Sequence, residues 1–321
     1  MKKKALLVSA VLALTVFYSC KKNEVKEIAQ KSAVAVAQDT IPLSLLNMND
    51  VTFAQLANPG DHRVIAGKYD VSAQVDGNGS KASFLSPTGL FVNTDGSLLL
   101  ADFDGDVRKL SHDTVVTSVK IPVDPDGFLY TGGNGVAVTT DGTMMIVADH
   151  EYWLYANGVS HYHGVDSHNQ LGAAVARDPS GKYFWYSTVD GLYAITPNNE
   201  NVPTQPLFAD IEGFSALSAS NNGVKYFASR GQMYKYTKSD VSARIFTNFT
   251  FGAITSLATT RDGFKVYLVD GGDIKVITNN SKFPKTITTL LSGEQVGSIA
   301  LSNSEKYLYY TSHNTVNKLK L

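Results

Sequence analysis

The chain has 321 residues, of which 43% are hydrophobic, and its formal net charge is −1. This length and composition provide enough apolar side chains for the core of one large domain or of two smaller ones. The balanced charge lacks the basic excess of a nucleic-acid-binding surface, so no nucleic-acid partner is expected. A single cysteine, Cys20, excludes a disulfide within the chain.

The first residues have the pattern of a secretory signal. Three lysines at residues 2–4 precede an apolar run at 5–17 that is too short to span a membrane comfortably. The small Ser19 and then Cys20 follow, which resembles a bacterial lipoprotein signal. We therefore expect residues 1–19 to be a signal peptide and Cys20 to carry lipid as the first mature residue. The alternative is an ordinary secretory signal with a coincidental cysteine.

The segment after Cys20 favours a tether that leads into a folded domain. Residues 20–40 are polar and lack strand alternation, so we predict a lipidated tether there. The lipid would anchor the protein to a bacterial membrane, in the periplasm or exposed on the cell surface. Residues 43–61 leave one or two helical turns open, and residues 62–67 (HRVIAG) predict a strand. A Gly-, Ser- and Asp-rich excursion at 68–86 comes next.

From residue 89 onward the chain contains six copies of one sequence repeat, at a spacing of about 42 residues. Each copy has an apolar run, a tight turn, a second apolar run and a third short run, which predicts antiparallel strands. Asp-Gly and Asn-Gly pairs supply the positive φ values that tight hairpin turns require. The turns fall at Asp95-Gly96, Asp141-Gly142, Ser180-Gly181, Asn222-Gly223, Asp262-Gly263 and Ser304-Glu305.

A spacing of about 42 residues with room for four short strands is typical of a β-propeller. We predict an all-β, six-bladed β-propeller over residues 41–321, formed by a monomeric domain. Its sixth repeat has three strands, and the strand at 62–67 has no blade of its own. We predict that this N-terminal strand completes the last blade and removes an exposed edge. A β-sandwich or two small β domains are the alternatives, although sandwiches do not repeat at this interval.

Residues 64–110 carry four features that resemble NHL-repeat propellers. These are an Ala-Gly strand end, an Asp-Gly loop, a Phe…Pro-x-Gly entry and an Ala-Asp strand followed by Val-Arg-Lys. The related gluconolactonase and regucalcin-like propellers share this architecture. The resemblance implies the fold across nearly the whole domain, but propellers host enzymes, receptors and scaffolds alike. The lactonase-like enzymes need a Glu at the first-blade entry, where this chain has Ser86-Pro87-Thr88-Gly89.

Polar residues recur in the loops that follow the second strands, the face where propellers of this type bind ligands. A ring of carboxylates there could hold a divalent cation or a polyhydroxylated ligand. The alternative is turn chemistry, in which Asp accepts hydrogen bonds from nearby backbone N–H groups. A zinc or copper site at the HYH sequence of residues 161–163 is also open. The candidate ligand-binding residues are Asp102, Asp104, Asp149, His150, Asp190, Arg230, Asp270 and His313.

Two functions follow from these observations. The first is a lipid-anchored envelope protein that binds a ligand, or a protein, peptide or glycan partner, over its loop face. The second is a metal-dependent, lactonase-like hydrolase or lyase, with calcium or zinc held by Asp149, Asp190 and Asp270 and with His150 or His313 as base. No nucleophile elbow, zinc-protease motif or phosphate-binding glycine loop is present in the sequence. A structural role in a larger envelope complex is a third possibility.

Overall fold

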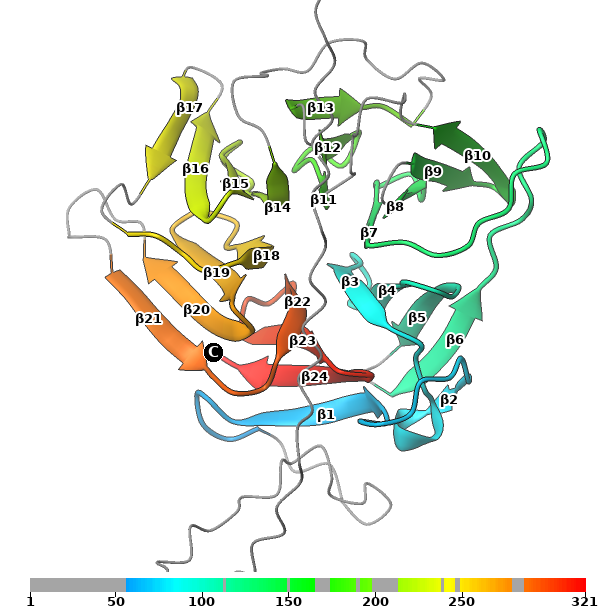
Figure 1. Cartoon of the computed structure of the whole chain (residues 1–321), viewed down its shortest axis with the longest axis horizontal. Helices are drawn as coiled ribbons and strands as arrows, with labels where there is room; N and C mark the ends of the chain where they lie inside the picture. The colour runs from blue at the N-terminus through cyan, green and yellow to red at the C-terminus, as the bar shows by residue number, and fades with distance from the viewer. Residues whose placement is uncertain are drawn as a thin grey trace, which may run out of the picture. The chain divides into compact units, whose positions relative to one another are not determined.

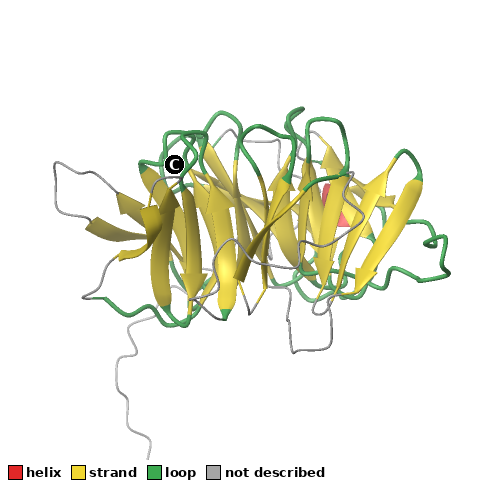
Figure 2. Ribbon diagram, turned by 90° about the horizontal axis from the view of Figure 1, so that it is seen from above, coloured by secondary structure: helices red, strands yellow, loops and turns green. Residues whose placement is uncertain are grey.

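Six small antiparallel sheets surround a central axis in the computed structural model (Figure 1). The structure describes residues 56–111, 114–148, 151–164, 174–188, 191–197, 213–237, 240–245, 249–278 and 286–321. Seen from the side, loops and turns gather along two opposite faces of the ring of sheets (Figure 2). Across the described ranges, no helix has the length and apolar character needed to cross a bilayer.

Each blade runs from an inner strand at the axis to an outer strand at the rim (Figure 1). The first three blades contain β3 (Pro87–Val92), β4 (Leu98–Asp102), β5 (Val107–Ser111) and β6 (Val115–Val119); β7 (Gly135–Val138), β8 (Met144–Ala148), β9 (Glu151–Ala156) and β10 (Val159–Gly164); and β11 (Ala174–Arg177), β12 (Phe184–Thr188) and β13 (Gly191–Ile195). The last three contain β14 (Phe214–Ala219), β15 (Lys225–Ser229), β16 (Gln232–Thr237) and β17 (Asp240–Ile245); β18 (Ile254–Thr259), β19 (Lys265–Asp270), β20 (Asp273–Thr278) and β21 (Thr286–Leu291); and β22 (Val296–Leu301), β23 (Tyr307–Ser312), β24 (Thr315–Lys320) and β1 (His62–Gly67). The six-bladed, all-β prediction is confirmed.

The second strand of each blade forms much of the core. All five residues of β4, β12 and β15 are buried, because each strand has a neighbour on both sides and a blade packed on each face. Strands buried on both faces lose the polar-apolar alternation of half-exposed strands. Their apolar side chains meet those of the next blade in clusters between neighbouring sheets. The core is therefore distributed around the ring, one cluster at each junction between blades.

The N-terminal strand closes the ring as the sequence predicts. Strand β1 pairs antiparallel with β24, with His62 opposite Leu319 and Gly67 opposite Thr315. Ile65 and Ala66 in β1 are almost completely buried. A strand from the start of the domain thus covers the edge that the last blade would otherwise expose.

The excursion at residues 68–86 packs against the first blade. It contains β2 (Gly77–Asn78), which extends the sheet beyond β6, and the short 3-10 turn η2 (Gly79–Lys81). The buried Arg108 of β5 donates to the carbonyl oxygens of Ser83 and Val75, each at 2.9 Å, and to Asp76 at 2.8 Å. This arginine, which lies in the Val-Arg-Lys part of the repeat, fixes the excursion to the blade.

Candidate ligand-binding mouths of the channel

The six inner strands line a channel that has two distinct mouths. In blade 1, Val92 at the end of β3 lies opposite Leu98, next to the hairpin turn, whereas Pro87 at its start lies opposite Asp102. We call the end at the hairpin turns the turn mouth. The end at the loops that follow the second strands is the loop mouth, where sequence analysis predicts the ligand.

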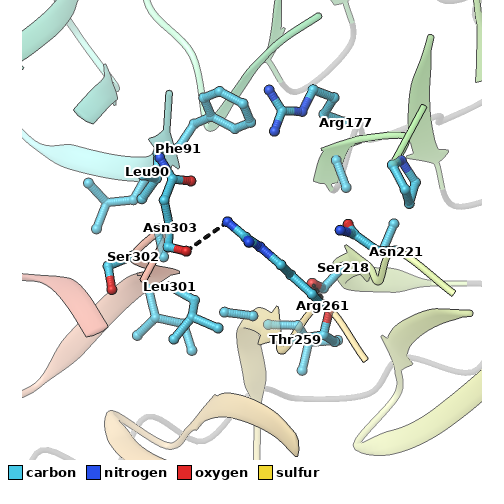
Figure 3. A pocket seen from close by; sticks show the side chains of 18 of the residues that line it. Leu90, Phe91, Arg177, Ser218, Asn221, Thr259, Arg261, Leu301, Ser302 and Asn303 are labelled. Carbon is cyan, nitrogen blue, oxygen red and sulfur yellow. Dashed lines mark hydrogen bonds between the residues drawn. The ribbon is translucent and has the colours of Figure 1, made fainter. Parts of the chain in front are cut away.

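A cavity with a volume of about 520 Å³ lies at the turn mouth. All six blades contribute to it, and Figure 3 shows polar and apolar side chains converging on the same space. The residue directly before each of the six turn pairs lies on its lining: Thr94, Thr140, Pro179, Asn221, Arg261 and Asn303. The six residues include hydroxyl, amide, guanidinium and proline side chains, while every turn has the same backbone hydrogen bond between its fourth and first residues.

Arg177 is the cation that this mouth presents from an inner strand. It ends β11 opposite Phe184, a register position that in the other five blades holds an uncharged residue: Val92, Val138, Ala219, Thr259 or Leu301. Its guanidinium lies 5.3 Å from the centre of the Phe91 ring (Figure 3). Partial burial lowers the pKa of Arg177, which remains a permanent cation at neutral pH. No described residue accepts a hydrogen bond from its guanidinium.

The second arginine at this mouth has a structural partner. Arg261 donates from Nη2 to the carbonyl oxygen of Asn303 at 2.7 Å (Figure 3). Its backbone N–H donates to the Glu305 carboxylate at 2.6 Å. These contacts join the turns of blades 5 and 6. The side-chain amide of Asn221 has no hydrogen-bond partner in the described part of the chain, so it remains available to a ligand together with Arg177.

At the loop mouth the described cavity is narrower, about 80 Å³. Its described lining contains no charged residue, and its polar members are Thr88, Asn134, Thr255, Ser256 and Ser298. Several of these hydroxyls are already engaged. Thr88 donates to the carbonyl oxygen of Gly133 at 2.9 Å, and Thr255 to that of Gly297 at 3.0 Å. The hydroxyls thereby connect neighbouring blades around the channel.

Two predicted ligand residues, Asp102 and Asp270, hold the backbone that leads into their own blades. Asp102 accepts hydrogen bonds from the N–H groups of Leu85, at 3.0 Å, and Ser86, and its carboxylate lies 3.7 Å from Arg108. Burial raises the pKa of Asp102, opposed by those hydrogen bonds. Asp270 accepts from the N–H groups at 252 and 253, at 2.7 and 3.1 Å, and from the ammonium of Lys275 at 2.7 Å. Both carboxylates make the backbone contacts that the turn-chemistry alternative describes.

The remaining predicted residues are exposed or lie outside the described ranges. Asp104 and Arg230 are exposed, and Arg230 has a positive φ of 47° in its turn. His313 is also exposed, and its Nε2 lies 3.0 Å from the hydroxyl of Tyr69. The predicted roles of these residues stay predictions. Those of Cys20, Asp149, His150 and Asp190 concern positions outside the described residues.

The described residues contain no group of three or more His, Cys, Asp or Glu side chains placed to hold a metal ion. The ring of His163 in the HYH sequence stacks on Tyr152, with 4.7 Å between ring centres. The calcium or zinc prediction involves Asp149 and Asp190, so it stays a prediction. Sequence analysis did not single out Arg177 or Asn221. An alignment of the six sequence repeats would reveal Arg177, because the equivalent positions directly before the other five turns are uncharged.

No family model matches this sequence, and no curated protein matches it. Solved structures do match it as folds. A Bacteroides thetaiotaomicron protein of unknown function aligns with a TM-score of 0.63 and 15% identity, over 81% of this chain and 75% of that one. A putative gluconolactonase aligns with a TM-score of 0.56 and 14% identity, over 81% and 91% of the two chains. A streptogramin B lyase aligns with a TM-score of 0.52 and 16% identity, over 72% and 78%.

The chain is thus a six-bladed β-propeller with lactonase-like and lyase-like structural neighbours. At these identities the comparisons establish the fold. Function has to be argued from the chain's own site.

Proposed function

We propose that this protein is a lipid-anchored binding protein of the cell envelope, whose ligand places a carboxylate against Arg177 at the turn mouth. The observation that carries the proposal is the guanidinium of Arg177, which has no acceptor among the described residues and lies in a cavity of about 520 Å³. A charged group that leaves water without a partner is costly, and a carboxylate is the acceptor that matches a planar guanidinium.

The rest of the lining suits an organic acid with several hydroxyl groups. Apolar side chains such as Phe91, Leu217 and Leu257 provide surfaces for the carbon skeleton. The free amide of Asn221 both donates and accepts hydrogen bonds, which matches a hydroxyl. The cavity therefore combines the cation of Arg177, the amide of Asn221 and apolar walls with Arg261, whose guanidinium is already bound to Asn303, as a small-molecule site does. The ligand that the sequence predicts at the loop mouth is a separate prediction, and it involves other residues than this cavity at the turn mouth.

Galacturonate and galactose are suitable probes, because one carries a carboxylate and the other a hydroxymethyl group on similar rings. We expect calorimetry with the full-length protein in detergent to show galacturonate binding at least about tenfold more tightly, since a charge-assisted hydrogen bond contributes about 1.5–3 kcal/mol. Arg177→Met should remove most of that preference. Lys306→Met is the matched control, because Lys306 is exposed beside the last turn and does not line the cavity. Equal binding of both sugars, or an unaffected Arg177→Met variant, would contradict the proposal.

The lipid anchor has its own test. The lysines at residues 2–4, the apolar run at 5–17 and Ser19 before Cys20 support lipidation of Cys20. In a bacterial host that processes lipoproteins, the protein should fractionate with membranes, and Cys20→Ser should release it into the soluble fraction. Mass spectrometry of the N-terminal peptide checks the modification directly. An unmodified Cys20 in the mature protein would sink this part of the proposal.

A further inference from the structure

A second cavity, of about 500 Å³, lies between blades 3 and 4 next to the turn mouth. We call it the side pocket. Its lining includes Tyr183 and Trp185 from blade 3, and Lys225 and Tyr236 from blade 4. Pro179 and Asn221 line both this pocket and the turn-mouth cavity. The two spaces therefore adjoin at a shared rim.

Lys225 occupies a position where the other blades have a buried apolar residue. It starts β15 opposite Ala219 and Tyr236. The same register position holds Leu98, Met144, Phe184, Val266 and Leu308 in the other blades, all buried. Lys225 is itself only 7% exposed. A lysine thus replaces a core residue at the one blade junction that contains the side pocket described here.

The ammonium of Lys225 has aromatic neighbours but no oxygen acceptor in the described part of the chain. Its Nζ lies 4.1 Å from the centre of the Trp185 ring and 5.5 Å from that of Tyr236. These cation–π contacts compensate only part of the cost of removing an ammonium from water. Burial accordingly lowers the pKa of Lys225, and the charge of Asp178 opposes that shift.

Asp178 does not supply the missing acceptor, because its own carboxylate is engaged. It accepts from the backbone N–H of Ser180 at 2.8 Å and from the indole N–H of Trp185 at 2.7 Å. Burial raises the pKa of Asp178, but hydrogen bonds from Ser180, Tyr183 and Trp185 outweigh it and hold the pKa below 3.8. Asp178 is therefore ionised at neutral pH with its charge already solvated by these donors, and the donors of Lys225 remain without an acceptor.

We infer that the side pocket is a second subsite of the turn mouth, which takes a neighbouring carboxylated unit of the same ligand, an acidic oligosaccharide. The inference rests on the proposed function at Arg177. Two adjoining cavities, each with a cation that lacks an acceptor, match a chain that carries carboxylates at successive units. The partly exposed rings of Tyr183 and Tyr236 offer faces for the C–H surface of a sugar ring. The free amide of Asn221 lies at the rim between the units.

Trigalacturonate and galacturonate test the inference by calorimetry on the full-length protein. The trimer should bind at least about tenfold more tightly than the monomer, because it engages both cations. Lys225→Met keeps the length of the side chain and removes its charge, so it should abolish most of the trimer's gain and leave monomer binding unchanged. Arg177→Met should weaken both probes. Lys182→Met is the matched control, because Lys182 is exposed in the adjacent turn and does not line the side pocket.

The fluorescence of Trp185 gives a second readout of the side pocket. Trp185 is one of two tryptophans, and Trp153 lies in blade 2. Trimer, but not monomer, should change the tryptophan fluorescence, and Lys225→Arg should retain that response. Equal affinity for trimer and monomer, with an unaffected Lys225→Met variant, would overturn the second subsite and leave the Arg177 proposal standing. Failure of both probes to bind would overturn the assignment of an acidic saccharide to either cavity.

Discussion

At the loop mouth, the acids that end the second strands accept backbone hydrogen bonds, whereas at the turn mouth Arg177 has no acceptor in the described residues. Asp102 and Asp270 belong to the repeated phrase and perform the same backbone task in blades 1 and 5. Arg177 and Lys225 depart from the repeat, and both line cavities. Residues that recur from repeat to repeat therefore stabilise the structure of the blade. A charged residue that breaks the pattern in a cavity is the stronger candidate for a ligand.

The largest expected effect tests whether Asp102 at the loop mouth stabilises the fold. Asp102→Ala leaves the N–H groups of Leu85 and Ser86 without their acceptor and removes the negative charge beside the buried Arg108. We expect a loss of about 3 kcal/mol in the free energy of unfolding, measured by denaturant titration. Asp104→Ala changes an exposed neighbour and should have little effect. If Asp102→Ala left the stability unchanged and abolished ligand binding, Asp102 would be a ligand-binding residue and its structural role would be contradicted.

A smaller change in the free energy of unfolding, of opposite sign, is expected at Lys225 and tests its role in ligand binding. Lys225→Leu restores an apolar residue like those at the equivalent positions, and it removes a buried ammonium that has no acceptor in the described part of the chain. We expect the free energy of unfolding to rise by about 1–2 kcal/mol in the absence of ligand. The same variant should lose the tighter binding of trigalacturonate. A destabilised Lys225→Leu would mean that the cation–π contacts with Trp185 and Tyr236 hold the blades together.

The hairpin turns themselves should give a modest, pH-dependent effect. Hydrogen bonds from the hydroxyl of Thr139 and the backbone N–H of Thr143 lower the pKa of Asp141 below 3.8. Because the folded pKa lies below the unfolded one, this contribution is present above pH 3.8 and is lost as the pH falls through the folded value. Asp141→Ala should cost less than about 1 kcal/mol at neutral pH, since the carboxylate is exposed. The unfolding free energies of the two proteins should converge as the pH falls below the folded-state pKa of Asp141; a constant gap would contradict the assignment.

The smallest expected effect concerns metal. Protein cations hold the carboxylate in the proposed site, so EDTA should leave galacturonate binding unchanged. Metal analysis of the purified protein provides the companion measurement. Stoichiometric calcium or zinc that is lost on changing Asp149 or Asp190 would favour the lactonase-like alternative, and loss of galacturonate binding in EDTA would contradict the role of Arg177 as the main anchor.

Much of the fold could be predicted from the repeat. The six tight turns predict the hairpins, and in the structure each of them joins the inner strand of a blade to the second strand that pairs with it. The truncated last copy and the strand at 62–67 predict the closure that β1 and β24 form. Local turn chemistry and strand periodicity carry this information, so one sequence was enough.

The candidate site was harder to predict, because burial and partners decide it. Asp102 in a sequence could be a ligand or a strand-end acceptor, and only the positions of Leu85 and Ser86 distinguish the two. The excursion at 68–86 reads as a polar loop, yet Arg108 fixes it to blade 1 through contacts that are distant in sequence. Lys225 follows the Asn222-Gly223 turn in the sequence, and no local pattern there indicates that the packing of blade 3 against blade 4 buries it.

The sequence by itself determined the number of blades, the order of their strands and the strand that closes the ring. These follow from a period, from turn residues and from one unpaired strand, all of which are local in the chain. Tertiary structure decided which mouth contains the larger described cavity and which charged groups lack partners there. The physical reason is that a cavity and an unsatisfied cation depend on where six blades place their side chains around one axis, and residues from Leu90 to Glu305 meet at that axis only after the ring has closed.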